Sequence, residues 1–142
     1  DNGGDQINRM LDEYAAQSAN PLCVTSLGAV RFLSALKHAE FVMGNSSSGI
    51  IEAPSMKIPT INIGDRQRGR LQAESIINCA PKTSEILEAM QKAATPEFKE
   101  LCKHVVNPNG DGKTSARIVS KIKEYCTTHE VDIMKKFYDL PQ

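Results

Sequence analysis

The sequence predicts an α/β domain with a Rossmann-like parallel sheet and flanking helices. Short apolar runs, at residues 40–44 and 59–63, alternate along the chain with stretches of helical periodicity. Short buried strands that alternate with helices are typical of βαβ units, whose crossovers are right-handed. A length of 142 residues fits one ordinary domain, so we treat residues 1–142 as a single unit.

The elements follow in order from periodicity and turn signals. Apolar residues at helical spacing predict a first helix, with Asp5 as its N-cap. The remaining elements are predicted as strands at 22–26, 40–44, 59–63 and 75–79, and helices at 29–38, 50–56, 84–94, 96–104 and 114–126. Residues 65–74 are polar and basic and are expected to form a loop, as are residues 107–112.

Composition restricts the function classes. Hydrophobic residues make up 40% of the chain, and 17 basic residues balance 17 acidic ones. No net field therefore attracts nucleic acid or an anionic membrane, and neither partner is expected. The four cysteines are widely spaced, which disfavours zinc and fits reduced cytoplasmic thiols, although two disulfides remain compatible with the sequence. We expect no metal and no cofactor.

The strongest candidate site is the small-residue turn after residues 40–44. Ligands of parallel α/β sheets bind beyond the carboxyl ends of the strands, which here means the loops after Ser26, Gly44 and Gly64. The second of these loops contains Ser46, Ser47, Ser48 and Gly49 just before a predicted helix. Backbone N–H groups at a helix start and serine hydroxyls can hold a phosphate. An ordinary serine and glycine helix cap is the alternative interpretation.

Three further residues have spacings that permit a role around a nucleotide. Glu52 lies one turn into the helix and could accept ribose hydroxyls, or it is a first-turn acid that interacts with the helix dipole. Arg66 belongs to a run of three arginines that could neutralise a diphosphate, or that forms a solvated loop. Phe32 could stack on a base, or it is a core residue.

Residues 112–114 (GKT) invite comparison with a P-loop. That motif needs a glycine five residues before its second glycine, and position 107 is Asn. The segment also follows no predicted strand, so we reject an ATPase interpretation.

Two motifs carry a resemblance to a known family. Residues 43–52 (MGNSSSGIIE) and 58–70 (IPTINIGDRQRGR) closely resemble the hydrolysing UDP-N-acetylglucosamine 2-epimerases of sialic-acid synthesis. Residues 137–141 (FYDLP) resemble the tail of the bacterial members, and residues 26–28 (SLG) with Phe32, and residues 110–112 (GDG), give weaker support. The resemblance spans essentially the whole chain.

The resemblance implies a fold, a ligand and a set of roles. The family has a two-domain fold of the glycosyltransferase-B type, and this chain resembles the C-terminal, UDP-binding domain without its first strand and N-terminal partner domain. Residues 113–142 are then a C-terminal helix and tail that pack toward the other domain. By resemblance, Ser46 and Ser47 hold the diphosphate with Arg66, Glu52 binds the ribose, and Phe32 lies against the uracil. A homodimer or homotetramer is also implied.

The family reaction converts UDP-N-acetylglucosamine and water to N-acetylmannosamine and UDP. The acids and bases acting on the sugar come largely from the N-terminal domain, so no catalytic residue is assigned here and the chain alone is expected to be inactive. Two related enzymes remain as alternatives: an epimerase for UDP-linked 2,4-diacetamido sugars, and the non-hydrolysing epimerase. A non-catalytic nucleotide-binding module and a plain structural domain are the non-enzymatic alternatives.

Overall fold

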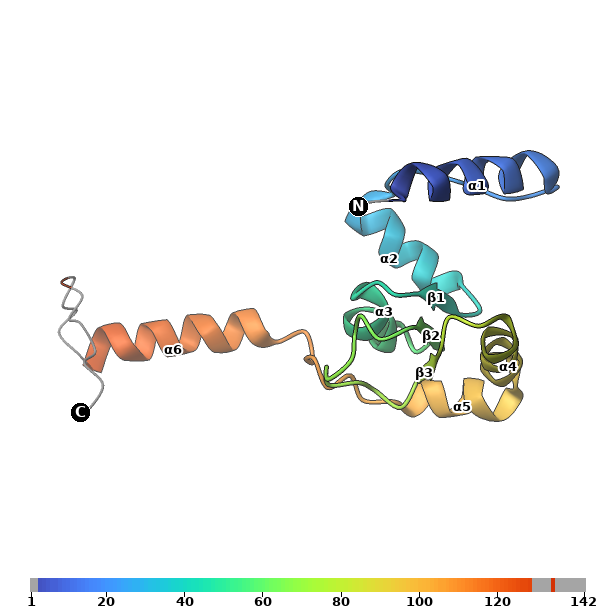
Figure 1. Ribbon diagram of the computed structural model, residues 1–142. Coiled ribbons are helices and arrows are strands. Elements are labelled where there is room, and N and C mark those ends of the chain that lie inside the picture. Colours follow the sequence, from blue (N-terminus) through green and yellow to red (C-terminus); the bar gives the residue numbers. More distant parts are fainter. Residues whose placement is uncertain (1–2, 129–133, 135–142) are drawn as a thin grey trace, which may run out of the picture.

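A three-stranded parallel sheet forms the centre of the molecule. The structure is a computed structural model that describes residues 3–128 and residue 134. The strands are β1 (Val42–Gly44), β2 (Thr60–Ile63) and β3 (Ile76–Cys79), in the order β1-β2-β3 (Figure 1). Val42 pairs with Thr60, and Thr60 with Ile76, so the three carboxyl ends meet at one edge. The predicted α/β class with a Rossmann-like parallel sheet is confirmed.

Helices cover both faces of the sheet. The helices of the described residues are α1 (Gly4–Gln17), α2 (Gly28–His38), α3 (Ser48–Ile51), the 3₁₀ helix η1 (Ala53–Met56), α4 (Thr83–Ala94), α5 (Pro96–His104) and α6 (Thr114–Thr128), and of these α3 and α4 pack directly on the strands. Alternate residues of a strand point to opposite faces. Ile61 therefore packs into the main core with residues of α4 and α5, whereas its neighbour Thr60 faces α3. A smaller core under α2 contains Leu36, Ala53 and Ile58.

Residues 22–26, predicted as a strand, form no strand, and that prediction was wrong. The segment is irregular, and Leu22 and Val24 are exposed. A strand requires a neighbour whose backbone groups complete its ladder, and the described sheet ends at β1. The apolar composition of residues 22–26 is therefore not enough to predict a strand.

The predicted helix at residues 50–56 is two short pieces. The α-helix α3 ends at Ile51, and η1 begins at Ala53 with Pro54 in its first turn. Proline lacks a backbone N–H and clashes with the preceding turn, which ends the α-helical hydrogen-bond pattern. A helix of four residues contributes only a small dipole, so the dipole argument for anion binding is weakened. The first helix also begins earlier than predicted, with Gly3 rather than Asp5 as its N-cap.

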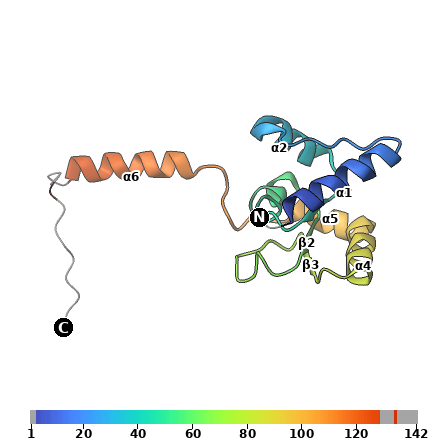
Figure 2. The same ribbon diagram turned by 45° about the horizontal axis from the view of Figure 1, so that its top comes forward.

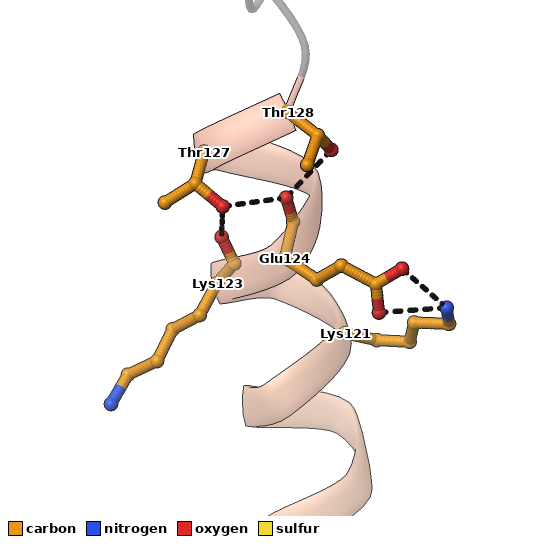
Figure 3. Close-up of polar contacts among 5 residues, drawn as sticks. All are labelled: Lys121, Lys123, Glu124, Thr127 and Thr128. Atoms are coloured by element: carbon orange, nitrogen blue, oxygen red, sulfur yellow. Dashed lines mark hydrogen bonds and ion pairs between the residues drawn. The ribbon is translucent and has the colours of Figure 1, made fainter.

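The last helix lies apart from the sheet. Figures 1 and 2 both show α6 extending away from the other elements, and none of its residues is buried. Its end is stabilised locally: Lys121 pairs with Glu124 at 2.8 Å, and the hydroxyl groups of Thr127 and Thr128 donate to the backbone oxygen of Glu124 (Figure 3). The resemblance at residues 137–141 lies outside the described residues. Within the described part of the chain, no helix combines the length and apolar character needed to cross a bilayer.

Candidate functional site

The turn after β1 presents several donors without acceptors. The backbone N–H of Ser48 donates to the Ser46 hydroxyl oxygen at 3.3 Å, and the N–H of Gly49 donates to the Ser46 carbonyl. Within the described residues, the backbone N–H groups of Ser46 and Ser47 donate to no acceptor. The hydroxyl groups of both serines also donate to no acceptor in this part of the chain. These four donors are available to an anion at the carboxyl end of β1.

The same turn rests directly on the central strand. Gly49 is buried, and its carbonyl oxygen accepts a hydrogen bond of 2.9 Å from the Thr60 hydroxyl. A Cβ atom added to Gly49 would lie 2.9 Å from Cγ2 of Thr60. That distance is shorter than real Cβ contacts, so this position requires glycine for close approach. The glycine fixes the depth of the turn against the sheet.

A cavity of about 630 Å³ joins the serine turn to the start of α2. Ser26, Phe32, Ser46 and Ser48 all line it, so four of the predicted site residues are brought together. The ring of Phe32 also packs against the small core of Leu36, Ala53 and Ile58, and is therefore partly a core residue. A cavity of this size lies within the range of small-molecule sites.

Glu52 carries a buried oxygen without a partner. It is the C-cap residue of α3, and its Oε2 atom is buried and makes no hydrogen bond with any described residue. Buried carboxylate oxygens ordinarily have partners, because leaving one unpaired costs about 1–3 kcal/mol. Glu52 does not line the cavity described above, so the structure does not bring it together with Ser26, Phe32 and Ser46 there.

Arg66 is exposed in the loop after β2 and makes no ion pair or hydrogen bond with the described residues. Its neighbour Gln67 is buried, with 2% of its surface exposed. The Gln67 Nε2 group donates to the backbone oxygen of Asn45 at 2.8 Å. This bond joins the arginine loop to the serine turn. Sequence reasoning missed it, because residues 65–70 are almost entirely polar and predict a solvated loop.

A second cavity, of about 730 Å³, opens at the carboxyl ends of β2 and β3. Arg68 and Arg70 line it, whereas Arg66 does not. A chain of amides lies along its wall: Asn62 donates to Asn78, which donates to Gln72, both at 2.8 Å. Asn62 and Asn78 are partners in the β2–β3 register. Their contact could not be predicted from the sequence, because it depends on how the two strands pair.

The loop at residues 107–112 is hydrogen-bonded to the end of α3 and to η1. Asn107 donates to the Ile51 carbonyl at 2.8 Å and to the Ser55 hydroxyl at 2.7 Å, and Asn109 donates to the Ile50 carbonyl. These bonds satisfy carbonyls at the end of α3 that have no helical partner. The ammonium of Lys57 also donates to the Val105 carbonyl. The sequence predicted this loop but not its contact with α3.

Comparison with known proteins decides the family. The family model described as UDP-N-acetylglucosamine 2-epimerase matches residues 1–123. The chain belongs to this family. Membership is consistent with the parallel sheet, the serine turn and the arginine loop seen in the structure, and it confirms the resemblance at the level of the epimerase family.

Three curated proteins are similar to the chain in sequence, over different shares of its length. Polysialic acid biosynthesis protein P7 of Escherichia coli is 32% identical over 100% of the chain and 36% of its own length. The UDP-N-acetylglucosamine 2-epimerase of Neisseria meningitidis is 35% identical over 99% of the chain and 36% of its own length. The GDP/UDP-N,N'-diacetylbacillosamine 2-epimerase (hydrolyzing) of Campylobacter jejuni is 40% identical over 70% of the chain and 26% of its own length. The chain therefore spans about a third or less of the length of these relatives.

Proposed function

We propose that this chain is the UDP-binding half of a hydrolysing UDP-N-acetylglucosamine 2-epimerase, and the C-terminal half of a glycosyltransferase-B type fold. The observation that carries the proposal is the set of unpaired donors at Ser46 and Ser47, beside a cavity that reaches Phe32. Hydrogen bonds to a charged group contribute about 1.5–3 kcal/mol each. Two or three such bonds are enough to hold a diphosphate without any net positive charge on the chain.

The other site residues would contact the remaining parts of the nucleotide. Glu52 has a buried acceptor oxygen suited to a ribose hydroxyl, and the Phe32 ring lies at the cavity wall, where a uracil can stack. Arg66 is an exposed cation on the adjoining loop and would approach the diphosphate from that side. In the reaction, UDP leaves the sugar and negative charge grows on its diphosphate. Donors already aimed at that charge stabilise the transition state.

We propose that the groups that act on the sugar are not in the cavity near Ser46. Among the described residues that line the cavity near Ser46, none has a side chain that titrates near neutral pH. General acid–base catalysis on the sugar needs such a group within hydrogen-bond reach. We therefore propose that the chain alone binds UDP but does not release UDP from UDP-N-acetylglucosamine. A coupled assay that detects UDP release by the purified chain would overturn this part of the proposal.

Calorimetric titration with UDP tests the binding site, and uridine separates its parts. Ser47→Ala removes one donor to the diphosphate, so the Kd for UDP should rise roughly 10- to 150-fold while uridine binding is unchanged. Glu52→Gln alters the ribose contact and should weaken UDP and uridine alike. If UDP produces no heat with the unaltered chain, the chain is a structural domain and the proposal fails.

A second substrate has a specific observation in its favour. The Campylobacter jejuni relative, at 40% identity, is named for a diacetylbacillosamine nucleotide. Incubation of an enzyme of the relatives' full length with each nucleotide sugar in turn would distinguish the substrates. Release of free N-acetylmannosamine supports our proposal, a free diacetamido sugar supports the second substrate, and an epimerised nucleotide sugar without release of UDP indicates the non-hydrolysing reaction.

A further inference from the structure

Gln67 is a buried polar residue within an otherwise exposed loop. Its neighbours Arg66 and Arg68 are exposed, whereas only 2% of the surface of Gln67 is exposed. Its Nε2 group donates to the Asn45 carbonyl at 2.8 Å, while its Oε1 atom is buried and has no partner among the described residues. An unpaired buried oxygen opposes folding, so this side chain is a poor device for stability alone.

The peptide group that Gln67 contacts is the one that ends in the Ser46 N–H. A peptide bond is planar and trans, so the carbonyl of Asn45 and the N–H of Ser46 point in opposite directions from the same rigid plane. Holding the carbonyl on the protein side therefore directs the N–H of Ser46 away from Gln67. The hydrogen bond also polarises the amide, which strengthens its N–H as a donor.

The serine turn is thus held at both ends. Gln67 holds the carbonyl of Asn45, and Thr60 holds the carbonyl of Gly49 at 2.9 Å. The first contact comes from the arginine loop and the second from the central strand. Between them lie the donors of Ser46 and Ser47, which have no acceptors of their own in the described structure.

We infer that Gln67 is a positioning residue that orients the Ser46 amide toward the nucleotide diphosphate and couples the loop carrying Arg66 to that site. The inference rests on the proposed function, because it requires a diphosphate at the serine turn. It assigns to Gln67 a role in binding that is separable from folding.

The test compares Gln67→Met with Gln72→Met. Methionine matches the shape of glutamine but lacks the amide donor. Gln72 lies in the same loop and contacts Asn78, not Asn45, so its substitution is the matched control. Three quantities are measured for each variant: the Kd for UDP by calorimetry, the Kd for uridine by NMR titration, and the melting temperature.

For Gln67→Met we expect UDP to bind about 10-fold more weakly, which corresponds to about 1.4 kcal/mol. Uridine affinity should change less than about twofold, and the melting temperature should stay within a few degrees of the unaltered chain, because an unpaired buried oxygen is removed together with the hydrogen bond. Gln72→Met should leave both affinities unchanged. If Gln67→Met does not fold, Gln67→Leu, which also lacks the amide donor, makes the same comparison.

Two outcomes would overturn the inference. Unchanged UDP affinity in Gln67→Met shows that the contact does not orient the site. Equal losses for UDP and uridine, with a lower melting temperature, show that Gln67 is structural only. Failure of the unaltered chain to bind UDP would instead refute the proposed function, and is recognised before any variant is made.

Discussion

Replacing Gly49 with alanine tests the close approach of the serine turn to β2. The added Cβ would lie 2.9 Å from Cγ2 of Thr60, and Thr60 is buried with 2% exposure. Neither group can move away freely, because the Thr60 hydroxyl is bonded to the Gly49 carbonyl. Overpacking of this kind costs about 1–3 kcal/mol. For a chain of this size we expect the melting temperature to fall by roughly 2–4 °C for each kcal/mol.

The variant Thr60→Ser is the second single change of a double-mutant cycle with Gly49→Ala. Serine keeps the hydroxyl that bonds the Gly49 carbonyl and removes only the obstructing methyl group, at a cost of about 1 kcal/mol for the lost apolar contact. In the double variant, the alanine methyl occupies the vacated space. Its destabilisation should therefore be smaller than the sum of the single changes, with a coupling of about 1–2 kcal/mol.

Denaturant unfolding of the four proteins measures this coupling, and UDP titration shows whether the displaced turn also loses affinity. Additive free energies of unfolding, or a Gly49→Ala variant as stable as the unaltered chain, would show that the turn does not rest on β2 as described.

Three more predictions concern neighbouring features. Asn107→Ala leaves the Ile51 carbonyl without its side-chain partner and should reduce stability by about 1–2 kcal/mol in denaturant unfolding; no change would contradict the capping role. The pKa of Asp111 is lowered from 3.8 to about 2, mainly by its hydrogen bond from Arg117. Because the folded pKa is depressed, the stabilisation is present above about pH 4 and is lost as the pH falls toward 2. The NMR titration of the Asp111 carboxyl should return toward 3.8 in Arg117→Gln, and an unmoved midpoint would contradict the pairing. Burial raises the pKa of the Cys102 thiol, so a thiol reagent should modify exposed Cys23 rapidly and Cys102 only on unfolding; rapid labelling of Cys102 in the folded chain would contradict its burial.

The sequence predicted the sheet well, because its strands are short, apolar and rich in β-branched residues. Residues 59–63 and 75–79 were found within a residue or two of β2 and β3. The same signal failed at residues 22–26, since apolar composition cannot show whether a neighbouring strand is present to complete the ladder. Pro54 accounts for the break between α3 and η1, which the predicted single helix at residues 50–56 did not include.

The candidate site was predictable only in its local part. The residues of the serine turn are contiguous in sequence, and their position directly after a predicted strand indicated a binding site. Gln67 was not predicted as a site residue because its hydrogen-bond partner, Asn45, lies 22 residues away along the chain. The arginine run was noticed, yet only the folded loop shows that Arg68 and Arg70, rather than Arg66, line the cavity beside β3.

The central claim is that the serine turn binds the diphosphate of UDP, and amide NMR tests it most directly. Addition of UDP to the ¹⁵N-labelled chain should shift the backbone amide signals of Ser46 and Ser47 strongly, whereas uridine should leave these two signals almost unchanged and shift residues near Phe32. Shifts confined to the cavity lined by Arg68 and Arg70, or equal shifts of the two serine amides with uridine, would contradict the account.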